Sequence, residues 1–161
     1  MQHIRDKIYL NRVAIQGGSK IIKVTSQSLR RDDLSQVISM LQQISINTRP
    51  TYDLEQIRKD FSFQTNVHTV VPSIGTEVVG YGCLVVEQKI RGGRLGHIED
   101  IVSHSNYHLQ GLGKHVVSQL IEIAKQEGCY KVVLNCRLQN EGFTKKSGFL
   151  NSKNTSMEIL V

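Results

Sequence analysis

Two adjacent carboxylates and a glycine-bearing loop are the residues of this sequence best suited to chemistry. Glu99 and Asp100 lie in a stretch that predicts a strand, and Gly111 and Gly113 follow at the start of a long amphipathic segment. A helix N-terminus exposes about four N–H groups and roughly half a positive charge, and glycines there let a phosphate approach closely. Lys114 adds a cation. The pattern predicts a site for a phosphorylated ligand beside a candidate proton acceptor.

The glycine loop does not match the common nucleotide-binding motifs. No Gly-Lys-Ser/Thr closes a Gly-x-x-x-x-Gly span, so the loop is not a P-loop. Val116 stands where a dinucleotide fingerprint has its third glycine. A Gly-x-Gly pair is by itself a weak signal, because tight turns into helices share it. The ligand class that remains is a nucleotide diphosphate other than NAD or a hydrolysed triphosphate.

Length and composition favour one folded domain with small anionic ligands. Two domains in 161 residues would have thin cores, and 39% hydrophobic with 21% charged residues is typical of a globular protein. The net charge of +6 favours anionic partners. Few aromatic residues, no Trp and scattered cations argue against a nucleic-acid-binding surface.

The sequence indicates neither export nor membrane insertion. No apolar run approaches the roughly 20 residues of a membrane span, and the first residues lack an apolar signal core. Cys83, Cys129 and Cys136 are odd in number and lack CxxC spacing, and the histidines lack metal-ligand spacing. We therefore expect reduced thiols, no metal and, since 159–161 is not a peroxisomal signal, a cytoplasmic location.

The elements that must position the site alternate between strands and helices. Strands are predicted at 21–25, 66–71, 78–88, 95–103, 130–136 and 157–160. Helices are predicted at 28–44, 54–61, 111–127 and 140–147. This order predicts an α/β (α+β) fold, a mixed and mostly antiparallel central sheet flanked by helices on both faces. Residues 1–20 are expected to form an N-terminal arm or extra strand, and residues 21–161 the domain.

Three segments together resemble a known superfamily. They are Gly96 to Val102, Tyr107 to Lys114 and Gly128 to Lys131, and they resemble the core of the Gcn5-related N-acetyltransferases (GNAT). Within that superfamily the chain is most similar to eukaryotic glucosamine 6-phosphate N-acetyltransferases. The resemblance covers about residues 21–160 and is strongest over 96–149. It implies the GNAT fold and direct acetyl transfer from acetyl-coenzyme A to the amine of glucosamine 6-phosphate, in UDP-GlcNAc biosynthesis.

The resemblance also implies which residues bind the donor. The coenzyme A pyrophosphate would lie on the glycine loop, formed by Leu109, Gln110, Gly111, Leu112, Gly113 and Lys114. The pantetheine arm would pair with the strand edge at Ile101, Val102 and Ser103. Backbone N–H groups there would also hydrogen-bond the thioester oxygen as it gains negative charge. Asn140 would contact the same arm, although it could also cap a helix, and the two roles are compatible.

The acceptor side of the expected site centres on the two carboxylates. Neighbours on a regular strand point to opposite faces, so Glu99 and Asp100 would not form a close pair. We expect Glu99 to accept the amine proton and Asp100 to contact the sugar or a dimer neighbour. The alternative is a solvent-exposed pair, or one bridged to Arg94. The other residues that the resemblance places on the acceptor side are Lys89, Ile90, Arg91, Lys131 and Asn135.

Four positions depart from the family pattern. His108 stands where the loop usually has Arg or Gln, and Asn135 stands where close relatives have an acidic residue contacting the sugar. Leu160 replaces a basic residue near the C-terminus. Thr144 occupies the place of a tyrosine that stabilises the leaving thiolate in many relatives. Thr144 is therefore the catalytic candidate there, unless water, another side chain or a shifted helix does that work.

These departures leave several readings open. The donor can be kept while the acceptor becomes a protein N-terminus, a lysine or another small amine; a polyamine fits poorly with the basic turn at 89–94. The chain could instead be a coenzyme A-binding sensor without catalysis, or a basic nucleic-acid-binding module. Because close relatives are homodimers that exchange C-terminal strands, a homodimer is expected.

Overall fold

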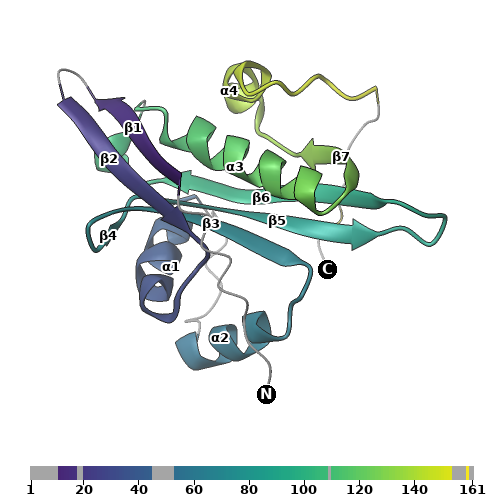
Figure 1. Cartoon of the computed structure of the whole chain (residues 1–161), viewed down its shortest axis with the longest axis horizontal. Coiled ribbons are helices and arrows are strands. Elements are labelled where there is room, and N and C mark those ends of the chain that lie inside the picture. Colours follow the sequence, from purple (N-terminus) through teal and green to yellow (C-terminus); the bar gives the residue numbers. More distant parts are fainter. Residues whose placement is uncertain (1–10, 18–19, 45–52, 109, 154–158, 160–161) are drawn as a thin grey trace.

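A central sheet organises the computed structural model, which describes residues 11–17, 20–44, 53–108, 110–153 and 159, with the backbone alone for 11–17 and 20–22 (Figure 1). Its strands are β1 (Asn11–Gly17), β2 (Lys20–Gln27), β3 (Val67–Ile74), β4 (Glu77–Val78), β5 (Gly80–Gln88), β6 (Arg94–Ser103) and β7 (Cys129–Leu134). Their order is β1-β2-β3-β5-β6-β7, with β4 beside β3. The described strands pair antiparallel except for β6 and β7, which are parallel. This confirms the mixed, mostly antiparallel sheet.

Helices cover both faces of the sheet, as predicted (Figure 1). On one face lie α1 (Leu34–Gln42) and α2 (Leu54–Ser62), and on the other α3 (Leu112–Gln126) and α4 (Glu141–Lys146). Short 3-10 turns precede α1, α3 and α4, at Arg31–Asp33, Ser105–Tyr107 and Leu138–Asn140. In the described part of the chain, no helix is both long and apolar enough to cross a bilayer.

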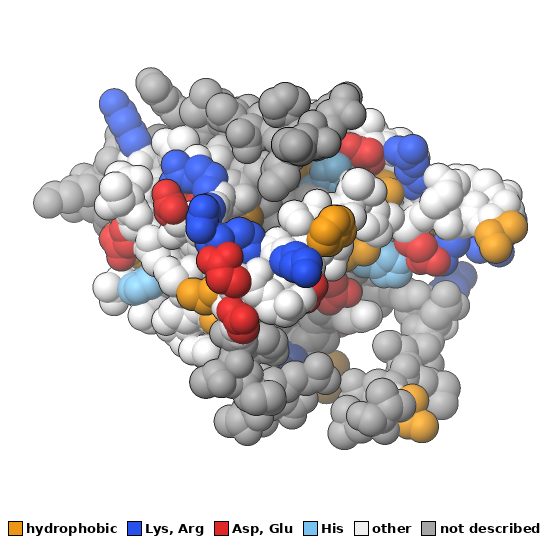
Figure 2. Space-filling model, turned by 90° about the horizontal axis from the view of Figure 1, so that it is seen from below, with side chains coloured by type: hydrophobic (Ala, Val, Ile, Leu, Met, Phe, Trp, Pro, Cys, Tyr) orange, Lys and Arg blue, Asp and Glu red, His pale blue; other side chains and the backbone are white. Residues whose placement is uncertain are grey.

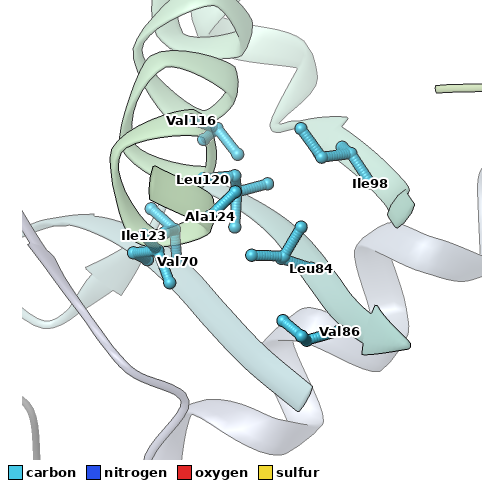
Figure 3. Packing of buried hydrophobic residues seen from close by; sticks show 8 residues of the cluster. All are labelled: Val70, Leu84, Val86, Ile98, Val116, Leu120, Ile123 and Ala124. Atoms are coloured by element: carbon cyan, nitrogen blue, oxygen red, sulfur yellow. The ribbon is translucent and has the colours of Figure 1, made fainter. Parts of the chain in front are cut away.

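The main core lies between α3 and the strands beneath it (Figure 3). One face of α3 carries Val116, Leu120, Ile123 and Ala124 at helical spacing, and these pack on Val70, Leu84, Val86 and Ile98. Full burial of each larger side chain stabilises the fold by about 1.5–3 kcal/mol. A Cβ at Gly82 would lie 2.5 Å from Cγ1 of Val116, so the missing side chain lets α3 lie directly on β5.

A second core fixes α1 against the opposite face. Val37 and Met40 of α1 pack with strand residues that include Val71, Tyr81 and Val102. The turn before α1 is fixed by Asp33, which is 2% exposed. Its carboxylate accepts hydrogen bonds from the backbone N–H of Arg30 at 3.1 Å and from its guanidinium at 2.9 and 3.0 Å.

One connection differs from the predicted element bounds, and some of the predicted segments lie partly outside the described residues. The connection predicted at 72–76 is shorter, because β3 continues through Pro72 to Ile74 before Gly75 turns with a φ of 61°. In the part expected to be an arm or extra strand, β1 pairs with β2. The division at residue 20 stays a prediction. The strand predicted at 157–160 falls on residues outside the described ones, apart from Ile159.

Candidate active site

β5 and β6 lose their regular pairing at the candidate carboxylates. Gly82 of β5 is opposite two residues of β6, Asp100 and Ile101, so β6 contains a β-bulge. Asp100 has a φ of 55° and, within the described residues, is the only non-glycine residue with a positive φ. This conformation costs roughly 1–2 kcal/mol and is typical of functional sites.

The bulge changes which residues of β6 share a face. Ile98 and Ile101 both pack against the α3 core, although residues three apart on a regular strand lie on opposite faces. The alternation expected for Glu99 and Asp100 therefore does not hold through Asp100. Both carboxylates lie in exposed residues. Arg94, the alternative ion-pair partner, instead donates to the carboxylate and the backbone oxygen of Glu127, at 3.2 and 2.9 Å.

Two buried side chains lie near these carboxylates: Tyr81, which the sequence analysis did not name, and Cys83, which it considered only as a reduced thiol. Tyr81 and Cys83 are 2% and 6% exposed, and the Cys83 thiol donates a hydrogen bond to the backbone oxygen of Glu99 at 3.6 Å. Burial, followed by the charge of Asp100, raises the pKa of the Cys83 thiol to about 12. Burial also raises the pKa of Tyr81 well above its usual value. Both groups are therefore protonated at neutral pH. Their i, i+2 spacing on a predicted strand was the available signal.

β6 extends well beyond its pairing with β7. The parallel register ends where Ile98 pairs with Leu134, whereas β6 continues to Ser103. Within the described residues, no strand pairs with β6 on this side along Ile101 and Val102. The structure thus has an uncovered strand edge at the residues expected to pair with the pantetheine arm. Ser103, at the end of that edge, accepts a hydrogen bond from Nε2 of His108 at 3.1 Å.

The glycine loop joins this edge to α3. Gly111 is the N-cap of α3, with a φ of 83° and no side-chain hydrogen bond to the first turn. A Cβ at Gly111 would meet nothing within 4 Å, so open space lies beside the helix N-terminus. This uncapped turn fits an anionic group such as a diphosphate. Lys114 is exposed beside it, and Oε1 of Gln110 is buried with no hydrogen-bond partner among the described residues, which do not include Leu109.

The second glycine of the loop serves packing between helices. A Cβ at Gly113 would lie 3.3 Å from the ring of Phe143, so α4 rests against the first turn of α3. One residue further on, Thr144 is buried and its hydroxyl donates to the backbone oxygen of Asn140 at 3.1 Å. Asn140 occupies the N-cap position of α4, but its side chain makes no capping bond. The N-cap position considered for Asn140 is therefore confirmed, but without a side-chain capping bond.

A cavity of about 1020 Å³ runs along β7 and α4. It brings together three residues that the sequence places in the site, Lys131, Asn135 and Thr144, and adds His97 of β6. Glu99, Asp100 and the glycine loop are not among its lining residues. The expected site residues thus form three groups, one on β6 with the start of α3, one around β7 and α4, and one on the hairpin between β5 and β6.

The basic hairpin between β5 and β6 carries its own carboxylate. The Lys89 ammonium lies 2.5 Å from one oxygen of Glu87, and Nε2 of His97 lies 3.0 Å from the other. Hydrogen bonds from Lys89 and His97 lower the pKa of Glu87. Ile90 and Arg91 are exposed at the tip, which projects beyond the other elements in Figure 1. The ion pair with Glu87 therefore keeps the Lys89 side chain below the exposed tip of the hairpin.

Charges of both signs are interspersed on the face covered by α1 and α2. Figure 2 shows acidic and basic side chains side by side there, without a single-sign patch. A nucleic-acid-binding surface gathers Lys and Arg on one face or along a groove. This face does not have that character.

Several curated proteins with similar sequences are named as glucosamine 6-phosphate N-acetyltransferases. The chain matches the acetyltransferase (GNAT) family over residues 34–149. It is 31% identical over 135 residues to the glucosamine 6-phosphate N-acetyltransferase of Trypanosoma brucei brucei, covering 80% of this chain and 90% of that one. It is 42% identical over 86 residues to probable glucosamine 6-phosphate N-acetyltransferase 2 of Oryza sativa subsp. japonica, covering 52% and 51%. The chain thus spans about half the length of this rice protein.

Solved structures lead to the same family. The glucosamine-6-phosphate N-acetyltransferase of Arabidopsis thaliana superimposes with a TM-score of 0.74 at 27% identity, covering 86% of this chain and 99% of that one. A Trypanosoma brucei acetyltransferase gives a TM-score of 0.74 at 29% identity, covering 85% and 99%. The family match, the trypanosome sequence and the splayed β6 that leads into an uncapped glycine loop agree, and this chain belongs to the acetyltransferase (GNAT) family.

Proposed function

We propose that this protein transfers the acetyl group of acetyl-coenzyme A to the amine of glucosamine 6-phosphate, giving N-acetylglucosamine 6-phosphate. One observation carries the proposal: the uncovered edge of β6 leads directly into an uncapped glycine turn at the start of α3. Proteins of the GNAT family use acetyl-coenzyme A. Support for the acceptor comes from the relatives, several of which are named as glucosamine 6-phosphate N-acetyltransferases.

The donor would lie along β6 and the start of α3. The backbone of 101–103 would pair with the pantetheine arm, and the turn at 110–114 would hold the pyrophosphate through its N–H groups. Acetyl-coenzyme A supplies an activated thioester. Asn140 is proposed as a further contact to the arm, since its side chain does not cap α4.

The groups proposed to accept or donate protons in the reaction lie on β6 and α4. The attacking amine must be a free base and must lose a proton, and Glu99 is the proposed acceptor because it is an exposed carboxylate beside the bulge. Asp100 is proposed to contact the sugar or a neighbouring subunit. Thr144 is the proposed hydroxyl beside the departing sulfur. Its hydrogen bond to the Asn140 carbonyl would first have to break. Direct transfer needs no covalent enzyme intermediate.

The acceptor phosphate would meet the basic residues of the β5–β6 hairpin and of β7. Arg91 and Lys89 are the first candidates, with Ile90 beside them, while Lys131 and Asn135 line the cavity at β7. Because Lys89 already contacts Glu87, an incoming phosphate would share or replace that carboxylate. Two anionic substrates accord with the net charge of +6.

A homodimer is part of the proposal. Among the described residues no strand pairs with the outer edge of β7, and the cavity extends along that edge. A strand from a second copy would satisfy its backbone groups. Sedimentation at micromolar concentration would contradict this if a monomer retained full activity. The proposed compartment is the cytoplasm, in keeping with cysteines that are free in the structure.

Thiol release from acetyl-coenzyme A tests the proposal directly. The purified protein would be given glucosamine 6-phosphate, unphosphorylated glucosamine and spermidine in parallel. Activity confined to the phosphorylated sugar is the expected result. Activity with another amine alone would show that the acceptor is a different amine. Coenzyme A binding without thiol release in the presence of any acceptor would favour a coenzyme A-binding sensor without catalysis. A matched Arg91→Ala variant should raise KM for the sugar phosphate and leave KM for acetyl-coenzyme A unchanged.

A further inference from the structure

A partly buried hydrogen bond connects the start of α3 to a distant strand. Nε2 of His115 lies 2.7 Å from Oγ of Ser26, 89 residues earlier in the chain. Ser26 belongs to β2 and is only 1% exposed. His115 follows Lys114 directly, so the bond reaches the turn proposed to hold the pyrophosphate.

A packed pair of apolar residues lies beside this bond. Leu112, the first residue of α3, clusters with Val24 of β2 and Val79. Val24 and Ser26 share a strand face because they are two residues apart, and Leu112 and His115 share a helix face because they are three apart. The first turn of α3 is therefore attached to β2 by one apolar and one polar contact.

The glycines of this turn make such attachment important. Gly111 has a positive φ and open space around its Cβ position, so it offers no side chain that could fix the loop. On the side where a Cβ of Gly113 would stand, the ring of Phe143 lies 3.3 Å away. Glycine also loses more conformational freedom on ordering than any other residue. The fixed points available on the inner side are thus Leu112 and His115.

The imidazole acts here as a neutral group. Burial lowers the pKa of His115, and a positive helix terminus also disfavours a cation. A neutral ring contributes a hydrogen bond of defined direction without adding a charge to attract phosphate. Its contribution is therefore geometric.

We propose that the Ser26–His115 pair positions the first turn of α3 so that its backbone N–H groups converge on the diphosphate of the donor. The inference rests on the proposed donor site and extends it to two residues that would not touch the donor. Ser26 and His115 are positioning residues. A residue that merely stabilised the fold would affect all ligands alike, whereas this pair should affect only ligands that carry the diphosphate.

Isothermal titration of coenzyme A and of pantetheine, which lacks the diphosphate, separates these roles. Ser26→Ala and His115→Leu should each weaken coenzyme A binding about fivefold, the effect of one lost hydrogen bond, and leave pantetheine unchanged. His115→Gln keeps a side-chain amide near the position of Nε2 and should restore most of the affinity. Ser118→Ala, an exposed position on the same helix, is the matched control.

The other outcomes distinguish a failure of this inference from a failure of the proposed function. Equal losses for both ligands, or no loss in either variant, would make the pair purely structural. If the wild-type protein does not bind coenzyme A, the proposed donor site is refuted, and this inference with it. Normal coenzyme A binding with no turnover of glucosamine 6-phosphate would refute the proposed acceptor and leave the role of the pair standing.

Discussion

Replacing Gly82 with alanine tests how closely α3 lies on the sheet. A Cβ there would be 2.5 Å from Cγ1 of Val116 and 3.2 Å from Cδ1 of Leu120. Carbon atoms pack best about 3.5–4.0 Å apart, so the first contact is too short by about 1 Å. Val116 is stiff at χ1 and fully buried, so the helix as a whole must move.

The expected cost follows from overpacking in a filled core. Inserting a methyl group of this kind destabilises a protein by about 1–3 kcal/mol. For a domain of this size each kcal/mol lowers Tm by about 2–4 °C, so Gly82→Ala should melt about 2–12 °C below the wild type. The movement would displace α3, and with it the glycine turn, so coenzyme A affinity should fall as well.

Thermal melts of a double-mutant cycle give the decisive comparison. Val116→Ala removes the clashing methyl groups, so it should cost less in the Gly82→Ala background than alone, a coupling of about 0.5–3 kcal/mol. Gly142→Ala is the matched control, because a Cβ there meets nothing within 4 Å. It should stabilise α4 by about 0.5–1 kcal/mol. A Gly82→Ala protein that melts like the wild type, or a cycle without coupling, would refute the close packing.

Three further outcomes are expected. Glu99→Gln should lower kcat about 100-fold or more and recover part of it as rising pH supplies free amine, and a flat pH profile with near-normal kcat would assign the proton to another acceptor. Thr144→Val should lower kcat about fivefold, the effect of one lost hydrogen bond of about 1 kcal/mol to the leaving thiolate; an unchanged kcat would leave the hydroxyl on the backbone oxygen of Asn140 and assign the thiolate to another group. Burial lowers the pKa of His115, so the folded protein takes up this proton less readily than the unfolded chain, and stability is lost as pH falls from about 6.5 toward the folded pKa. His115→Gln should therefore lose less Tm than the wild type between pH 7 and 5.5, whereas parallel curves would contradict the assignment.

Local pattern was enough to predict most elements and the glycine turn that precedes α3. The spacing along α3 and the glycines before it identified the helix start, because both signals are contained in consecutive residues. The bulge at Asp100 was not predictable, since it depends on how β6 meets β5 and no proline or glycine marks it. The link between Ser26 and His115 joins residues 89 positions apart, and a single sequence carries no sign of such a contact.

The direction of the Thr144 hydroxyl is a further, more local feature that the sequence did not predict. Its type and place in the sequence suggested a hydroxyl available to the leaving group. In the folded helix the hydroxyl reaches back to the carbonyl four residues earlier, an arrangement that competes with any other use of its proton. Residue identity thus indicated the location, and only three-dimensional geometry showed where the proton goes.

The extra residue in β6 is not required by either hydrophobic core. Removing Asp100 would restore a regular ladder with β5 and bring Ile98 and Ile101 to a spacing of two, so Ile101 would still face α3 and Val102 would still pack toward α1. Deletion of Asp100 should therefore leave both cores in register and remove the strained backbone. The bulge thus changes the strand mainly at Glu99 and Asp100, and the packing of the helices on the sheet does not depend on it.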